Sequence, residues 1–365
     1  MIIKYLDLKT INEPYEHAAD EVLRSGWYLK GDYTRCFEQA YAEYIGTRHC
    51  VGCGNGLDAL TLIFRAYIEM GLMHEGDEVI VPANTYIASI LSVTENRLKP
   101  VFVEPDINTL QIDDTLIEHA ITPHTRAIMI VHLYGRCAYT DRIGELCRRY
   151  NLKLIEDNAQ AHGCVFDAVL PLCRTGSLGH AAAHSFYPTK NLGAFGDAGA
   201  VTTDDDELAE IICTIGNYGS SKKYVFDHLG RNSRMDEIQA AILLAKLHDL
   251  DTNNQRRKEI AARYEREVSN DLVRILLSDR DSVYHIFSVL CPRRNELQRY
   301  LAGNGVGTEI HYPVPPHKQK CYQQWHTLEL PVTEQIHAQE LSIPCHQALT
   351  DDEVTRIINL LNTFK

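Results

Sequence analysis

Two separated segments of the chain hold side chains that together could do chemistry on a carbonyl compound. Lys190 follows a predicted strand, Ala181–Phe186, in a loop that Pro188 and three later glycines keep from forming a helix. A lysine in a desolvated loop has a lowered pKa and can act as a nucleophile toward carbonyl carbons. Asp157 follows the apolar run Leu152–Glu156, at the carboxyl end of a predicted sheet, where open α/β sheets bind ligands.

A third segment is a glycine-rich turn before a helix. Gly52, Gly54 and Gly56 alternate, and Asn55 can cap a helix predicted over Leu57–Met70, whose first amides would form an anion site. The spacing does not fit G-x-G-x-x-G, so the turn is no dinucleotide fingerprint. Each segment alone is also consistent with an ordinary loop. Together they supply an amine, a carboxylate and a phosphate cradle, which a pyridoxal 5′-phosphate (PLP) site requires.

The elements that must position these residues alternate between strand and helix. Short apolar runs, typical of strands buried on both faces, occur at Glu78–Pro82, Pro100–Glu104, Ala127–Leu133, Leu152–Glu156 and Ala200–Thr203. Helices are predicted between them, at Ile87–Glu95, Asp113–Ala120 and Asp141–Tyr150. This alternation predicts an α/β fold with a mostly parallel sheet covered by helices.

The pattern changes near residue 235. A strong helix is predicted over Met235–Leu250, and Ser233 with Asp236 resembles a capping box at its start. A charged helix is expected to follow over Asn253–Glu267, with Arg256 and Arg257 on its solvated face.

The remaining sequence mixes both kinds of element. A strand is predicted over Tyr284–Leu290, and a proline-bearing stretch covers Tyr312–Pro316. We therefore predict a large domain over 1–240 and a smaller α+β domain over 241–365.

Composition limits the classes of partner. The chain carries 36 basic and 49 acidic residues, a net charge of −13, which disfavours nucleic acid and anionic lipid. No run approaches the roughly 20 apolar residues of a membrane span, and the start is too polar for a signal peptide. We expect a cytoplasmic protein. The 11 scattered cysteines indicate reduced thiols, and no metal site is predicted.

Six motifs carry a resemblance to a known family. In chain order they are Asn55–Leu60, Pro82–Tyr86, His132–Gly135, Glu156–Gln160, Ser185–Lys190 and Gly230–Arg234. The chain resembles the DegT/StrS family of sugar aminotransferases, which are PLP enzymes of fold type I. The similarity runs from Leu6 to the C-terminal region. It implies a large PLP-binding domain like that of aspartate aminotransferase.

The resemblance also implies roles for individual residues. Lys190 would hold PLP as a Schiff base, and Asp157 would pair with the pyridinium nitrogen. The other implied cofactor contacts are Gln160 near the 3′ oxygen, Tyr86 on the ring face, the amides of Gly56 and Leu57 with the Ser185 hydroxyl at the phosphate, and Asn232 from the neighbouring subunit. The active enzyme would therefore be a homodimer.

Further stretches resemble transaminases that make dTDP-3-amino-3,6-dideoxyhexoses. The implied acceptor is a dTDP-3-keto-6-deoxyhexose, and the implied amino donor is L-glutamate. Candidate sugar-nucleotide contacts, which could equally be ordinary packing aromatics, are Trp27, Tyr28, Tyr224, His311 and Tyr312. Three positions depart from the family pattern and have no assigned role: Arg136, His180 and His184.

Other functions remain alternatives. A dTDP-4-keto-sugar transaminase keeps the same site, as does a sugar dehydratase, although the dehydratases normally replace the lysine with histidine. A sensor that binds PLP without turnover is a further alternative, which the presence of Lys190 and Asp157 disfavours. A nicotinamide dehydrogenase lacks its glycine fingerprint here.

Overall fold

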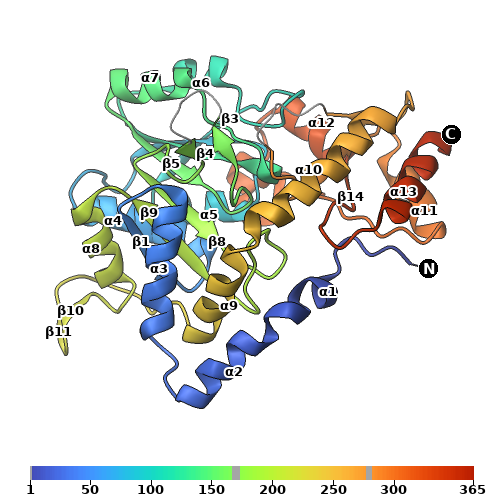
Figure 1. Cartoon of the computed structure of the whole chain (residues 1–365). Helices are drawn as coiled ribbons and strands as arrows, with labels where there is room; N and C mark the ends of the chain where they lie inside the picture. Colours follow the sequence, from blue (N-terminus) through green and yellow to red (C-terminus); the bar gives the residue numbers. More distant parts are fainter. Residues whose placement is uncertain (1, 167–172, 277–281) are drawn as a thin grey trace.

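A seven-stranded sheet with helices on both faces forms the larger part of the molecule (Figure 1). The computed structural model describes residues 2–166, 173–276 and 282–365. The sheet order is β1-β9-β8-β5-β4-β2-β3, and β9 runs antiparallel to both neighbours while the other strands are parallel. The strands are β1 His49–Cys53, β2 Glu78–Pro82, β3 Lys99–Val103, β4 Thr125–Val131, β5 Lys153–Asp157, β8 Ala181–Ser185 and β9 Gly199–Thr203. The predicted mostly parallel α/β sheet is confirmed.

Alternate residues of each strand pack on opposite helical layers. In β2, Val79 and Val81 join a core with α4 Gly56–Glu69, α5 Ile87–Glu95 and α8 Asp206–Ile215. Ile80 faces the other layer, because successive strand side chains point to opposite faces. That layer contains α3 Asp32–Ile45, α6 Asp114–Ala120, α7 Asp141–Tyr150 and α9 Glu237–Leu247. Both faces of the sheet are therefore covered by helices and buried.

A second, three-stranded antiparallel sheet lies in the C-terminal part. Its order is β12-β13-β14, with β12 Arg274–Ile275, β13 Phe287–Leu290 and β14 Glu340–Ile343. Helices α10 Leu250–Glu267, α11 Arg294–Gly303, α12 Pro331–Gln339 and α13 Asp351–Thr363 surround it. Ile3 from the N-terminus packs into the same core. Helix α9 spans the predicted boundary at residue 240, so the division into 1–240 and 241–365 stays a prediction.

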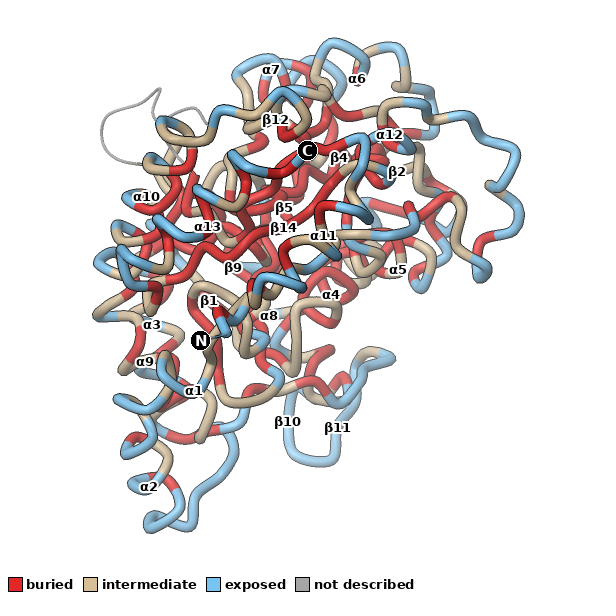
Figure 2. Tube along the Cα trace, turned by 90° about the vertical axis from the view of Figure 1, so that its right-hand side faces the viewer, coloured by how far each residue is buried: buried red, intermediate tan, exposed pale blue. Residues whose placement is uncertain are grey.

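The N-terminal helices and a hairpin extend from this body. They are α1 Leu8–Asn12, a 3₁₀ turn Glu13–Tyr15, α2 Glu16–Ser25, and the hairpin of β10 Ser220–Lys222 with β11 Val225–Phe226. Figure 2 shows that this hairpin projects from the body, and its residues 221–226 are exposed. A second hairpin pairs β6 Val165–Phe166 with β7 Cys173–Arg174. In the described part of the chain, every helix is too short or too polar to cross a lipid bilayer.

Two expectations about α9 and α10 are wrong. Helix α9 begins at Glu237, and the Ser233 hydroxyl accepts a hydrogen bond from Gly54 N at 2.9 Å instead of capping the helix. Arg257 does not lie on a solvated face, since only 3% of its surface is exposed. A helical wheel cannot reveal this, because α10 is covered on that side by chain that arrives 27 and 88 residues later.

Candidate active site

The sheet order brings the three predicted segments together. Strands β5 and β8 are parallel neighbours, so Asp157 and the Ser185–Lys190 segment leave the sheet at the same edge. Helix α4 begins beside them, because Gly199 of β9 lets the Asn55 backbone approach. A Cβ atom at Gly199 would lie 2.4 Å from the Asn55 carbonyl carbon. The sequence predicted the three segments but not that they are neighbours, because the strand order cannot be read from it.

These segments enclose a cavity of about 430 Å³. Nine of the residues predicted for the site line it, namely Gly56, Leu57, Tyr86, Asp157, Gln160, Ser185, Lys190, His311 and Tyr312. His285, from the segment before β13, also lines the cavity and was not expected. It lies there because the C-terminal part folds over the edge of the main sheet.

Lys190 stands in a tight turn after β8. Its backbone amide donates to Tyr187 O at 2.8 Å, and Ala194 N returns to Phe186 O at 2.8 Å, which closes the loop. Burial lowers the pKa of Lys190 to about 8, and attraction to Asp157 opposes this shift only in part. The unprotonated fraction of the amine near neutral pH is therefore much larger than for a lysine of ordinary pKa, which favours its action as a nucleophile or base.

Asp157 is held by a serine that the sequence did not assign. Ser89 Oγ of α5 donates to Asp157 Oδ2 at 2.8 Å, and Thr85 Oγ1 lies 2.8 Å from Ser89 Oγ. Burial raises the pKa of Asp157, whereas the Ser89 hydrogen bond, the Ala159 amide and Lys190 oppose that rise. Ser89 carries no motif that identifies this role. Only the packing of α5 against β5 reveals it.

Glu156, the other acid at this strand end, points to the opposite face of the sheet. Its carboxylate accepts hydrogen bonds from Gly176 N, Leu178 N and Gly179 N at 2.7–2.8 Å, and from His132 Nε2 at 2.8 Å. The strand pleat thus separates the two acids, and Asp157 alone faces the cavity.

The start of α4 forms a cradle beside Ser185. Asn55 Oδ1 caps the helix by accepting from Asp58 N at 2.8 Å, as predicted. A Cβ atom at Gly56 would lie 2.5 Å from Ser185 Cβ, so only glycine lets the two backbones approach. Gly54 N is fixed by Ser233 Oγ. The first residues of α4 and Ser185 thus line one cavity, and a helix start beside a hydroxyl fits a phosphate group.

Aromatic and amide side chains close the other side of the cavity. The rings of Tyr86 and Tyr312 are 5.1 Å apart. Gln160 is fixed at both ends, because its Nε2 donates to Tyr312 Oη at 3.0 Å and its Oε1 accepts from Tyr134 N at 2.6 Å. His311 Nδ1 lies 2.8 Å from Ser342 Oγ, and burial lowers the pKa of His311 to about 4. These groups form a neutral, preorganised wall.

A buried polar chain lies beneath Ser185 and gives His184 a role. Tyr41 Oη lies 2.9 Å from Nδ1 of both His162 and His184. His162 Nε2 donates to Ser185 O at 2.8 Å, and His184 Nε2 lies 2.8 Å from Thr202 Oγ1. Burial lowers the pKa of both histidines, to about 4 for His162. His184 thus has a structural role: it contacts Tyr41 and Thr202 in the buried chain in which His162 holds the Ser185 backbone.

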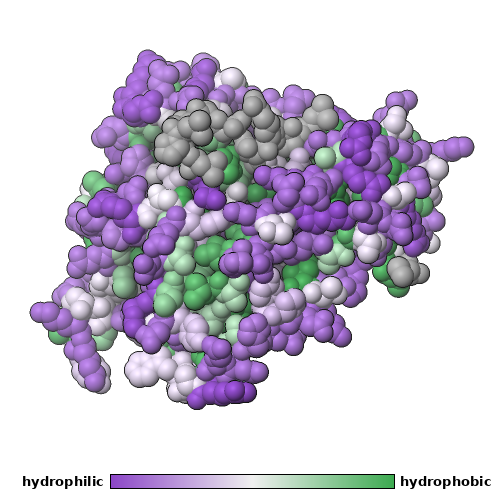
Figure 3. Space-filling model, viewed as in Figure 1, coloured by the Kyte–Doolittle hydropathy of each residue, from purple (hydrophilic) through white to green (hydrophobic). Residues whose placement is uncertain are grey.

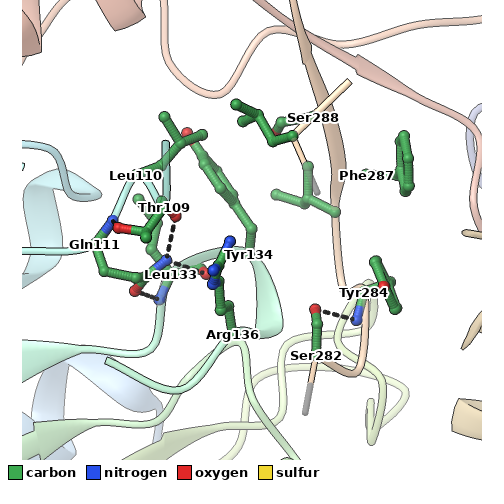
Figure 4. Close-up of a pocket in the computed structure, with 12 residues that line it drawn as sticks. Thr109, Leu110, Gln111, Leu133, Tyr134, Arg136, Ser282, Tyr284, Phe287 and Ser288 are labelled. Carbon is green, nitrogen blue, oxygen red and sulfur yellow. Dashed lines mark hydrogen bonds between the residues drawn. The ribbon is translucent and has the colours of Figure 1, made fainter. Parts of the chain in front are cut away.

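Arg136 and His180 lie away from the cavity that contains Lys190. His180 Nδ1 accepts from Leu154 N at 2.9 Å and so fixes the start of β5. Arg136 lines a separate hollow of about 50 Å³ with Gln111, Tyr134 and Ser288 (Figure 4). In that hollow Gln111 Nε2 donates to Leu133 O at 3.1 Å. Neither residue therefore lines the cavity that contains Lys190.

Four predicted residues do not line the cavity. Trp27, Tyr28 and Tyr224 are 64%, 50% and 81% exposed, and Tyr224 stands in the turn of the β10–β11 hairpin. Asn232 is exposed and pairs with Asn217 beside the hairpin. One chain alone does not bring these side chains to Lys190, so their roles stay predictions.

A family model matches residues 9–362, and its description is the DegT/DnrJ/EryC1/StrS aminotransferase family. This chain belongs to that family. Membership in the DegT/DnrJ/EryC1/StrS family confirms the resemblance carried by the six motifs and the aminotransferase class of the chain.

Individual relatives of the DegT/DnrJ/EryC1/StrS family match over nearly the whole length. The chain is 49% identical to the dTDP-3-amino-3,6-dideoxy-alpha-D-galactopyranose transaminase of Aneurinibacillus thermoaerophilus, covering 100% of this chain and 99% of the relative. It superposes on the crystal structure of Streptomyces venezuelae DesV in complex with a ketimine intermediate, with a TM-score of 0.93, 42% identity and coverage of 99% and 98%. NtdA from Bacillus subtilis, solved with bound cofactor PMP, gives a TM-score of 0.88 at 31% identity, with coverage of 99% and 84%.

Proposed function

We propose that this chain is a PLP-dependent transaminase that transfers the amino group of L-glutamate to a nucleotide-linked keto-sugar. The observation that carries the proposal is the meeting of Lys190, Asp157 and the α4 cradle in one cavity. A lysine of lowered pKa, a buried carboxylate and an anion site are the three groups that a PLP site needs. The fit of this cavity to PLP rests on these side chains and on the close approach of Gly56 to Ser185.

The residues divide the work of holding the cofactor. The amides of Gly56 and Leu57 and the Ser185 hydroxyl would bind the phosphate, with the α4 dipole aiding an anion in a chain of net charge −13. Tyr86 would stack on the ring, and Gln160 would contact it near the 3′ oxygen. Bound PLP would supply an electron sink for the substrate carbon.

Two ionisable groups, Asp157 and Lys190, would carry the proton chemistry. Asp157, ionised and oriented by Ser89, would keep the pyridine nitrogen protonated, because opposite charges at close range favour both ionised forms. Lys190 Nζ, in its unprotonated form, would take a proton from the substrate carbon that bears the nitrogen and deliver it on the cofactor side of that nitrogen. Its pKa of about 8 lies near the operating pH, where a general base is most effective.

For the acceptor we propose a dTDP-3-keto-6-deoxyhexose, which would give a dTDP-3-amino-3,6-dideoxyhexose. The name of the 49% identical relative supports this substrate. A dTDP-4-keto-6-deoxyhexose or another nucleotide sugar is the alternative, and a non-catalytic PLP-binding sensor is the alternative outside enzymes. His311 and Tyr312 line the cavity and would contact the sugar.

We further propose a homodimer with shared sites. Trp27, Tyr28 and Tyr224 are large, exposed and aromatic, which is typical of side chains that a partner covers. Figure 3 shows a hydrophobic patch over α9 within a mostly hydrophilic face. In such a dimer Asn232 would reach the phosphate of the neighbouring subunit, and Trp27, Tyr28 and Tyr224 would contact its nucleotide sugar.

The test is transfer of isotopic nitrogen. The purified protein with PLP and ¹⁵N-glutamate is offered dTDP-3-keto- and dTDP-4-keto-6-deoxyhexoses, and product spectra locate the label. Label at C3 supports the proposal, and label only at C4 replaces the acceptor by the alternative. PLP binding without label in any sugar, while a reference transaminase reacts, would favour the sensor.

A further inference from the structure

Arg257 is a buried cation with most of its hydrogen-bonding capacity unused. It lies on α10, is 3% exposed, and contacts two carbonyl groups through one nitrogen only. Nη1 donates to Tyr284 O at 3.2 Å and to Cys345 O at 2.6 Å, which uses both of its hydrogens.

The other two nitrogens lack acceptors. A guanidinium carries five N–H donors, and within the described residues Nε and Nη2 of Arg257 make no hydrogen bond. No carboxylate among those residues lies within ion-pair distance of it either. Burial lowers the pKa of Arg257, yet arginine stays charged at neutral pH. An uncompensated buried charge is costly, which makes this position unusual.

Arg257 lines a second cavity next to the catalytic one. Arg257 lines a space of about 490 Å³ with Tyr5 and Cys345. This space and the catalytic cavity share five wall residues, namely Tyr187, Thr189, His285, Ile286 and His311. The two spaces therefore adjoin each other along one wall.

Among the described residues that line this second cavity, Arg257 is the cation without a carboxylate partner. Lys4 also lines the cavity, but it is paired with Asp7 at 2.9 Å and is therefore less available than Arg257 to bind an anion. Glu309, the acid in the lining, is exposed and screened by solvent. Arg257 and Lys190 also line a common narrow cleft, so a ligand held by one is near the other.

We propose that Arg257 binds a carboxylate of the amino donor in this second cavity, an inference that rests on the proposed transaminase function. The planar guanidinium matches a carboxylate through two parallel N–H···O bonds. A donor held there would direct its amino group toward the cavity of Lys190. The hydrogen bonds of Nη1 have a structural role, because they join α10 to the segments before β13 and after β14. A structural role does not account for the buried Nε and Nη2, which make no hydrogen bond to the described residues.

The test uses glutarate, a dicarboxylate without an amino or keto group, so that binding is measured apart from turnover. Glutarate is titrated calorimetrically into the PLP-loaded wild type, Arg257→Gln, Arg257→Lys and the control Arg263→Lys. Arg263 lies on the same helix and pairs with Glu267 at the surface. Unfolding curves check each fold, and Arg257→Lys, which keeps a cation, serves if Arg257→Gln is unstable.

We expect the dissociation constant for glutarate to rise roughly 10- to 150-fold in Arg257→Gln, as loss of a hydrogen bond to a charged group predicts. Arg257→Lys should give a smaller rise and Arg263→Lys none. Equal glutarate affinity in wild type and both Arg257 variants would overturn the proposal. Inorganic phosphate that binds in an Arg257-dependent way while glutarate does not would replace the carboxylate by a phosphate group.

Glutamate separates this proposal from the proposed function. If glutamate changes the absorption spectrum of the PLP-loaded protein with the same half-saturation in wild type and the Arg257 variants, the inference fails and the transaminase stands. If glutarate binding depends on Arg257 but glutamate never changes the spectrum, the donor role fails together with the proposed function.

Discussion

Replacing Ser89 by alanine tests whether the support of Asp157 sets its charge. Ser89 Oγ donates to Asp157 Oδ2 at 2.8 Å, and both side chains are buried. A hydrogen bond to a charged group contributes about 1.5–3 kcal/mol, and one pKa unit corresponds to about 1.36 kcal/mol. Ser89→Ala should therefore raise the pKa of Asp157 by about 1 to 2 units.

The sign of the pH effect follows from the charge that PLP needs. The carboxylate must be ionised to pair with the pyridinium nitrogen, and ionisation is lost as the pH falls through the pKa of Asp157. Burial already raises that pKa, and Ser89 opposes the rise. Loss of Ser89 should move the acid limb of PLP binding upward by about 1 to 2 pH units, with unchanged affinity on the alkaline plateau.

The assay is the dissociation constant of PLP for the apoprotein as a function of pH. The ionisations of free PLP are the same in every titration. Any difference in the pH dependence between a variant and the wild type therefore comes from the protein. Ser92→Ala is the matched control, because Ser92 is an equally buried serine of α5 that donates to Ser89 O and does not contact Asp157. Coincident acid limbs for Ser89→Ala and wild type would show that Ser89 does not set the charge of Asp157.

Three further perturbations have expected outcomes. Gly56→Ala places a Cβ against Ser185 and should weaken PLP binding roughly tenfold or more, as loss of one hydrogen bond to the phosphate predicts. The control Gly303→Ala adds a Cβ in open space and should leave PLP binding unchanged. Equal affinity for PLP in both variants would contradict a phosphate site at Gly56. Tyr41→Phe leaves two buried histidines without their shared partner and should lower the free energy of unfolding by about 1–3 kcal/mol in urea; an unshifted midpoint would remove its structural role. Asp157→Asn should lower the pKa of Lys190 below about 8, because the attraction that raises it is lost; the pH dependence of reductive methylation at Lys190 reports it, and a higher pKa would be inconsistent.

The sequence predicted the site where residue type and local pattern suffice. Lys190, Asp157 and the cap at Asn55 follow from a loop lysine, a strand end and a glycine turn, and the structure gathers them. Helices α5 and α7 also have their predicted bounds. These features depend on neighbours along the chain, so local patterns contain the needed information.

Other features depend on contacts between distant segments. Ser89 reaches Asp157 across 68 positions, and Arg257 is buried by chain from Tyr284 and Cys345. The serine has no chemical signature of its own, and the arginine follows a charged helical pattern that indicates solvent. The prediction of Ser233 as a helix cap was wrong for the same reason, because its hydroxyl accepts a hydrogen bond from the distant Gly54 N.

Whether Lys190 holds PLP can be measured by an absorption titration of the purified protein with PLP, followed by L-glutamate, in wild type and Lys190→Ala. If Lys190 carries the cofactor, wild type develops a band near the visible edge that glutamate shifts, and the folded Lys190→Ala variant lacks that band before glutamate is added. A wild-type spectrum equal to free PLP, or an identical band in Lys190→Ala, would contradict the account.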